Sequence, residues 1–199
     1  MRPDDRTLAG LLFFAGAAQF IVAMVIAEGA LPDYSVSRDA ISALGVGPTA
    51  GLFNASVFLL GALTIGAAFL FDRTHGRRWL TLLFVLSGVG AMGVGVFPET
   101  IPLPHGISAM IAFLFGSISA IAAWFVLRSP LRWLSVLLGA VGLVALALFS
   151  SGTYLGIGLG GMERMVAYPV LLWEIALGGH LMATAAPVEA APPQPSKKS

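Results

Sequence analysis

The sequence predicts an all-α protein, a polytopic bundle of six transmembrane helices with both termini in the cytoplasm. Three observations lead to this fold class. Hydrophobic residues make up 57% of the 199 residues and charged residues only 11%, which lies outside the usual range of soluble domains. The hydrophobic residues gather in six long runs. The basic residues concentrate at the termini and in every second connection between the runs.

Each of the six runs is close to the length of about 20 residues that a helix needs to cross a bilayer. In order, the runs cover residues 8–27, 52–71, 79–97, 106–127, 133–149 and 165–183. Together they predict one transmembrane domain over residues 1–185. Residues 186–199 are rich in Pro and Ala and end in "SKKS", so we expect a disordered cytoplasmic tail.

The distribution of Lys and Arg predicts how the bundle is oriented. If the N-terminus is cytoplasmic, two basic residues face outward, Arg38 and Arg164. The cytoplasmic segments then hold the other nine: Arg2, Arg6, Arg73, Arg77, Arg78, Arg128, Arg132, Lys197 and Lys198. Because cytoplasmic connections carry an excess of Lys and Arg, we expect both termini inside. The predicted location is the cell membrane, with a multi-pass topology.

Most of the unusual polar residues lie in the three connections that this topology places outside. These connections contain "AEGALPDYSVSRDAISALGVGPTAG", "PETIPLPH" and "SGTYLGIGLGGMER". The cytoplasmic connections "DRTHGRR" and "RSPLR" are short, basic and typical of plain turns. Any functional site is therefore predicted on the extracytoplasmic face.

Composition also limits the partners and cofactors. The chain has no cysteine, which excludes disulfides and thiolate chemistry, and its net charge of +1 gives no basic face for nucleic acid. One well-placed histidine with carboxylates offers too few ligands for zinc, so we expect no metal and no cofactor. The expected partners are membrane lipids and a small-molecule or lipid ligand. The oligomeric state is not indicated.

Glu99 and His105 are the first candidate pair, in the second outer connection. Prolines on either side stiffen this segment, and His105 is expected at the start of the fourth helix, with Ser108 one turn deeper on the same face. A neutral imidazole near pH 7 can act as a general base, and a nearby carboxylate would fix its tautomer. The alternative is that both side chains merely face water and headgroups.

The first outer connection contains a second candidate cluster. In "YSVSRDAISALG" we expect Ser37 to cap a short helix over residues 38–44, with Asp39 and Ser42 on one face. Asp39 would join His105 as a catalytic candidate, and Ser37 and Ser42 would bind ligand. The alternative is an amphipathic helix that lies on the membrane surface without chemistry.

The sixth run supplies the other ligand-binding candidates, Glu163, Arg164 and Glu174. Arg164 would pair with an outer carboxylate or hold an anionic headgroup. Glu174 follows Glu163 by eleven residues, close to three helical turns, so both acids share a face with Ala167 and Val170. A carboxyl near mid-bilayer is costly if it faces lipid, so Glu174 must face the bundle. We predict that Asp39, Glu99, His105 and Arg164 converge on an outward-facing polar pocket.

Four short segments together resemble the DUF998 family of archaeal and bacterial membrane proteins. They are "YSVSRDAISALG", "FNASVFLLG", "GVFPE" followed by His105, and "MER", in this order and spacing. The family is similar at a greater distance to the eukaryotic Frag1/DRAM/Sfk1 group, whose members have roles in lipid-anchor remodelling and autophagy. The resemblance implies a membrane protein of this length and span number. Where the family often reads I-S-D-L-G, this chain has Ala43 after Ser42.

Three classes of function fit these observations. The first is a protein that binds or processes a lipid or other amphiphile in the outer pocket, with His105, Glu99 and Asp39 as its catalytic candidates. The second is a small-molecule or proton-coupled transporter that uses Glu174. The third is a non-catalytic membrane scaffold whose polar outer residues only stabilise the bundle. Whether the protein is an enzyme is not decided by the sequence.

Overall fold

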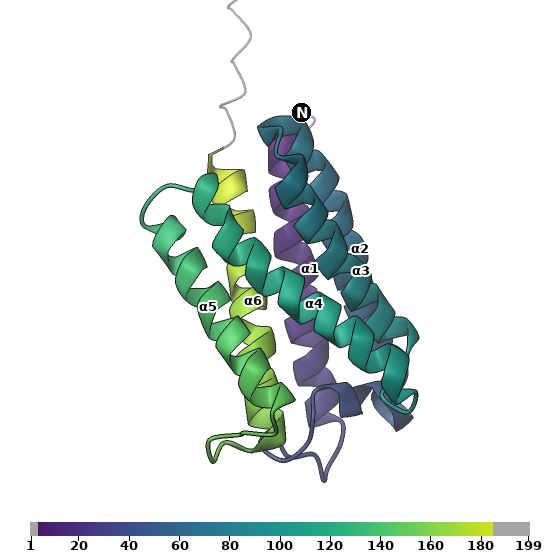
Figure 1. Ribbon diagram of the computed structural model, residues 1–199. Coiled ribbons are helices and arrows are strands. Elements are labelled where there is room, and N and C mark those ends of the chain that lie inside the picture. The colour runs from purple at the N-terminus through teal and green to yellow at the C-terminus, as the bar shows by residue number, and fades with distance from the viewer. Residues whose placement is uncertain (1–3, 185–199) are drawn as a thin grey trace, which may run out of the picture.

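The computed structural model describes residues 4–184, and within them the chain forms six long α-helices and no strand (Figure 1). The helices are α1 (Asp5–Gly29), α2 (Ala50–His75), α3 (Arg78–Val96), α4 (Pro102–Ala122), α5 (Leu131–Ser150) and α6 (Gly158–Ala183). Three short 3₁₀ helices are η1 (Ser42–Gly45), η2 (Gly47–Thr49) and η3 (Ala123–Phe125). The tail predicted at residues 186–199 lies outside the described residues.

All six helices are long and apolar enough to cross a membrane. The predicted all-α, six-helix fold class is therefore confirmed, and the chain is a multi-pass membrane protein. Many large apolar side chains point away from the bundle, such as Leu103 and Phe125 with exposed fractions of 73% and 69%. Hydrocarbon chains can cover such side chains, whereas in water they would be costly.

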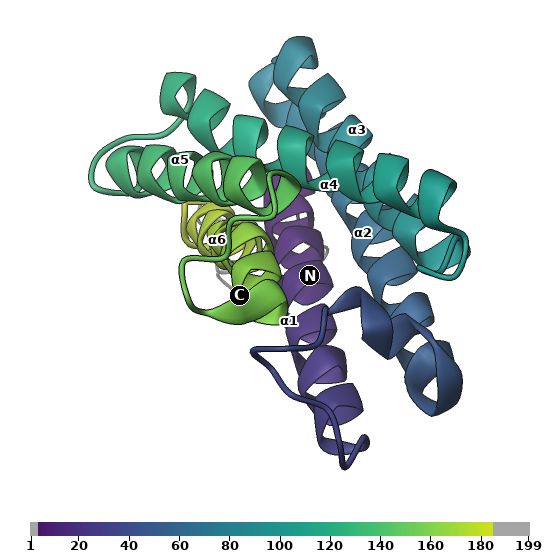
Figure 2. The same ribbon diagram turned by 60° about the horizontal axis from the view of Figure 1, so that its bottom comes forward.

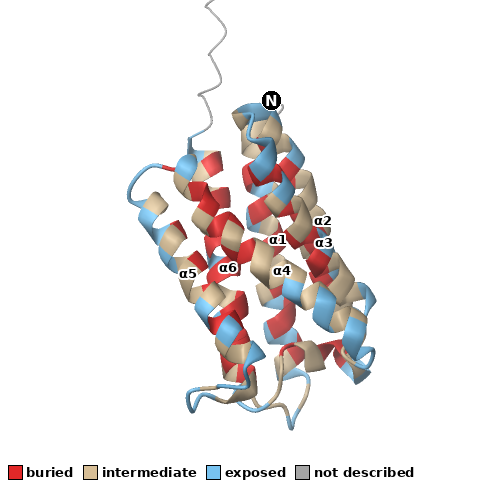
Figure 3. Cartoon of the chain, viewed as in Figure 1, coloured by how far each residue is buried: buried red, intermediate tan, exposed pale blue. Residues whose placement is uncertain are grey.

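Consecutive helices run in opposite directions and pack side by side, and α6 returns to contact α1 (Figures 1 and 2). The helices therefore form a closed ring, with an additional contact between α4 and α6 across it. Figure 3 shows buried residues on the inward sides of the helices and exposed residues on the outward sides. Of the six, α6 is the most buried, so its side chains form much of the interior.

Small residues allow the helices to approach closely, as the glycine-rich runs predict. A Cβ atom added at Gly61 in α2 would lie 2.3 Å from the carbonyl oxygen of Gly88 in α3. Gly10 in α1 and Gly178 in α6 oppose each other in the same way, at 2.6 and 2.5 Å. Larger residues at these four positions would force the helix pairs apart, because no flexible side chain can yield there.

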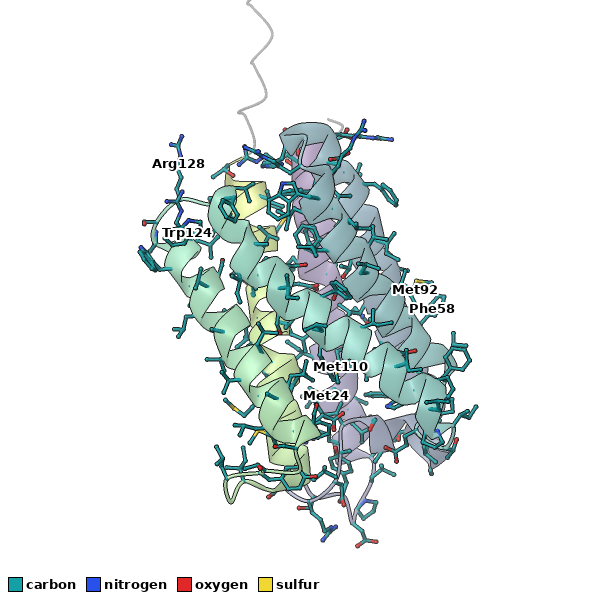
Figure 4. All side chains as sticks on the ribbon, in the orientation of Figure 1. Met24, Phe58, Met92, Met110, Trp124 and Arg128 are labelled. Carbon is teal, nitrogen blue, oxygen red and sulfur yellow. The ribbon has the colours of Figure 1, made fainter. Side chains whose placement is uncertain are left out.

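The two ends of the bundle differ in size and charge. The loop end holds the connections of residues 30–49, 97–101 and 151–157, and the terminal end holds the start of α1, the end of α6 and the shorter connections (Figure 1). Trp124 and Arg128 lie at the terminal end (Figure 4). The arginines of the described residues divide as the sequence predicts, with Arg38 and Arg164 at the loop end and the rest at the terminal end.

Candidate functional site

Arg164 is the centre of a hydrogen-bonded cluster at the loop end. Its side chain is 5% exposed and forms an ion pair with Glu28 at the end of α1. The guanidinium also donates to the Tyr34 hydroxyl at 2.8 Å and to the carbonyl oxygens of Val36 and Gly160 at 2.8 and 2.9 Å. One side chain of α6 thus holds the end of α1 and the first connection together.

Tyr34 extends this cluster. Its hydroxyl accepts from Arg164 and donates to the carbonyl oxygen of Ala40 at 2.8 Å. Burial raises the pKa of the Tyr34 hydroxyl, so it stays protonated and keeps this donor role. The first connection is therefore fixed on α6 by buried, charge-assisted hydrogen bonds rather than lying free on the surface.

Two glycines at the start of α6 let the first connection lie directly against the helix. The amide of Gly160 donates to the carbonyl oxygen of Ser37 at 2.9 Å. A Cβ atom at Gly160 would lie 2.1 Å from the carbonyl oxygen of Asp39, and one at Gly158 would lie 2.2 Å from that of Ser37. Gly158 also has a φ of +80°, which other residues rarely adopt. The glycine-rich "GIGLGG" segment is explained by this contact.

The structure changes two expectations for this region. No α-helix forms over residues 38–44: the segment is a turn followed by η1, and the Ser37 hydroxyl donates to the carbonyl oxygen of Ile157 instead of capping a helix. The amide of Ile41 donates to Glu163 at 2.6 Å. In a regular helix over residues 38–44 this amide would instead be used in a hydrogen bond within the helix. In addition, α6 begins at Gly158 rather than 165, so Glu163 and Arg164 lie in its second turn.

The structure places Glu99 and His105 in different contacts. Glu99 accepts a hydrogen bond from the Ser42 hydroxyl at 2.8 Å. This bond joins the first outer connection to the second outer connection, residues 97–101. The Nδ1 atom of His105, in the first turn of α4, lies 2.8 Å from the carbonyl oxygen of Phe97 in the connection that precedes this helix. Both side chains are half-buried, and no hydrogen bond or ion pair joins them within the described residues.

The remaining outer candidates also have separate partners. The Asp39 carboxylate accepts from the side chain of Arg38, which lowers its pKa, and from the amide of Ser35. It meets Arg164 only through its backbone carbonyl, at 3.5 Å. Ser108 lies against α3, where a Cβ atom at Gly93 would be 2.4 Å from its hydroxyl oxygen. The four side chains predicted to converge thus each have their own separate partners.

The first connection, held on α6 by Arg164, forms a cap over the loop end of the bundle. A cavity of about 80 Å³ lies beneath this cap. Near the loop end it is bounded by Ile41 and Glu163, and at its deep end by Thr64, Ser87 and Glu174, which occupy the middle thirds of α2, α3 and α6. Most of its wall is apolar. A space of this size can hold several water molecules or part of an alkyl chain.

One face of α6 forms the side of the cavity. Glu163, Ala167, Val170 and Glu174 all line it, which is the face that the eleven-residue spacing of the two acids predicts. The adjacent Trp173 does not line the cavity; it donates to Ser135 of α5 at 3.0 Å and stacks on Phe84 of α3. The helix therefore directs its two acids to the cavity while its large aromatic side chain packs in the hydrophobic core.

Glu174 is buried with little compensation. Its residue is 4% exposed, its Oε1 atom lies 3.5 Å from the Thr64 hydroxyl, and its Oε2 atom has no hydrogen-bond partner. A buried polar atom without a partner costs free energy, so this site needs an explanation beyond folding. Within residues 4–184 no group of three or more His, Asp or Glu side chains is arranged to hold a metal ion.

The model of the family described as "Protein of unknown function (DUF998)" matches residues 14–180, most of the chain. The protein is a member of the DUF998 family. The match includes the first connection, the cavity wall and both acids of α6. No curated protein and no solved structure matches the chain.

Sequence reasoning missed three residues of this DUF998 member. Glu28 was overlooked as the partner of Arg164, although an acid that directly ends an apolar run is a signal that its charge is held. Thr64 and Ser87 were overlooked because single hydroxyl residues in membrane helices are common and usually bond to their own backbone. Only the structure shows that they face the same cavity as Glu174.

Proposed function

We propose that this protein binds an amphiphilic molecule, such as a lipid or a lipid-like small molecule, in the central cavity. The observation that carries the proposal is Glu174, a buried carboxyl that faces the cavity with one oxygen unpaired. An apolar wall with one or two convergent polar groups is the usual composition of a small-molecule site. The apolar part of the ligand would contact the wall, and its polar group would bond to Glu174.

We place the entrance at the loop end and on the extracytoplasmic side. The excess of arginine at the terminal end supports this orientation, since cytoplasmic connections are enriched in basic residues. Glu163 and Ile41 bound the cavity beneath the first connection, so a ligand that enters there passes the cap held by Arg164. The predicted location is the cell membrane.

Binding is favoured over catalysis by the positions of the catalytic candidates. His105 does not line the cavity and bonds to a backbone carbonyl, and Asp39 is held by Arg38 at the surface. An acid–base mechanism needs its groups within hydrogen-bond reach of the reacting atoms. The two acids that do line the cavity, Glu163 and Glu174, are suited to binding a polar group of a ligand rather than to acid–base catalysis.

Native mass spectrometry of protein purified in mild detergent tests the proposal. We expect the wild type to retain an amphiphile and Ala167→Leu, which fills the cavity, to lose it. Ala176→Leu is the matched control, because it adds the same bulk to α6 outside the cavity wall. Equal retention by both variants, or no specific adduct in the wild type, contradicts the proposal and favours a scaffold.

A further inference from the structure

The cavity has an unusual charge pattern. Its lining contains two carboxyl groups, Glu163 and Glu174, and no Lys, Arg or His. The parts of the wall contributed by α1, α2, α3, α4 and the first connection hold no titratable side chain, and their polar members are Thr64 and Ser87. The ion pairs formed by the described residues all lie elsewhere.

Glu174 therefore faces only one other titratable group, Glu163, eleven residues away on the same helix. This corresponds to about 16 Å along the helix axis. An isolated ionised carboxylate in such surroundings is strongly disfavoured, so the empty site holds Glu174 as the neutral acid. The neutral acid can become charged when a cation arrives to pair with it.

We propose that the ligand of this cavity carries a monovalent ammonium-type cation on an apolar body, and that its binding displaces the proton of Glu174. The inference rests on the proposed function and names the ligand class for the same site. An anionic group would meet two carboxyls and no cation, whereas an ammonium group forms a charge-assisted hydrogen bond with Glu174. Phe20, Phe53 and Phe113 in the wall add aromatic faces, which attract cations.

The proton balance of this exchange is simple. As the ammonium ion reaches Glu174, the O–H bond of the carboxyl breaks and its electron pair stays on the oxygen. The released proton passes to water, and the site is left with a neutral carboxylate–ammonium pair. The net charge of the cavity is therefore the same before and after binding, so no uncompensated charge is buried at either stage.

A series of three probes with the same alkyl chain tests the ligand class: hexylammonium, 1-hexanol and hexanoate. Isothermal titration calorimetry of the full chain in one detergent compares the wild type with Glu174→Gln, which removes the ionisable group. We expect Glu174→Gln to weaken hexylammonium binding about tenfold or more, as the loss of a charge-assisted hydrogen bond predicts, and 1-hexanol binding far less. Hexanoate should not bind at this site in either protein.

Asp72→Asn is the matched control. Asp72 is a half-buried acid near the end of α2 at the terminal end, with one buried oxygen that also lacks a partner, and it does not line the cavity. Its substitution should leave the binding of all three probes unchanged. Glu174→Asp, which keeps the carboxyl, should retain the preference for hexylammonium over 1-hexanol.

A second readout does not depend on the variants. In weakly buffered solution with a pH indicator, the wild type should release one proton for each hexylammonium bound and none for 1-hexanol. If hexylammonium and 1-hexanol bind equally and no proton is released, the cation inference is overturned while amphiphile binding stands. If Ala167→Leu binds every probe as the wild type does, the proposed function itself fails.

Discussion

Arg164 and Glu174 are two buried ionisable residues of the same helix, ten positions apart, with exposed fractions of 5% and 4%. Both terminal nitrogens of Arg164 have hydrogen-bond partners, from α1, the first connection and α6 itself, and its Nε atom alone lacks one. Glu174 has one long contact with Thr64 and an oxygen with no partner. Burial is the same, so the difference lies in how far each group is satisfied.

This difference separates structural from functional polar groups. A buried charge whose partners come from several segments fixes those segments, and its loss leaves another charge unpaired. A buried carboxyl that faces a cavity with a free oxygen stabilises nothing that the structure shows, and such groups in membrane helices are functional candidates. The cap at the loop end is therefore a framework, and the chemistry is expected beneath it.

Arg164→Ala should have the largest effect on stability. The substitution leaves the half-buried Glu28 without its cation and frees the first connection, so we expect a loss of about 3–5 kcal/mol. Thermal unfolding in detergent measures it. Arg38→Ala is the control, because the Arg38–Asp39 pair is exposed and should shift the midpoint little. Similar midpoints for the two variants would show that Arg164 does not hold the cap.

Gly160→Ala tests how closely the first connection lies against α6. The added Cβ would lie 2.1 Å from the carbonyl oxygen of Asp39, so the connection must move, at a cost of about 1–3 kcal/mol. Gly179→Ala in the same helix meets nothing within 4 Å and should stabilise by about 0.5–1 kcal/mol. Chemical denaturation measures the change in the free energy of unfolding for each variant, and we expect a loss for Gly160→Ala and a gain for Gly179→Ala. Equal changes in the two variants would argue against the close contact.

Ala167→Leu should be better tolerated than Ala120→Leu. The first substitution adds its bulk to the cavity, so we expect a change below about 1.5 kcal/mol. The second adds the same bulk where Ala120 is fully buried in a packed cluster, so we expect a loss of about 1–3 kcal/mol. Unfolding midpoints compare the two directly. A larger loss for Ala167→Leu would mean that the cavity is filled in the native protein.

Ser42→Ala should have the smallest effect. It removes the half-buried hydrogen bond to Glu99, worth about 0.5–1.5 kcal/mol. Glu99→Gln keeps an acceptor for the same hydroxyl and should cost less than Ser42→Ala. The unfolding midpoints of the two variants provide the measurement, and probe binding in the cavity should be unaffected by either. A loss of binding would bring the Ser42–Glu99 contact into the functional site.

The sequence predicts the bundle well because long apolar runs leave few alternatives in a membrane. It also predicts the inward face of Glu163 and Glu174, since their spacing follows from helix geometry alone. It does not predict the partner of Arg164, because the choice between Glu28 and the outer acids depends on how the first connection folds. That fold follows from close contacts at Gly158 and Gly160, which involve residues more than 100 positions apart.

The most direct test of this account is the protonation state of Glu174, read by infrared difference spectroscopy of the protein in lipid bilayers. We expect a band from a neutral buried carboxyl that is absent in Glu174→Gln and that disappears from the wild type when hexylammonium is added. A carboxylate signal from Glu174 in the empty protein would contradict the account. So would a neutral carboxyl band that does not respond to hexylammonium.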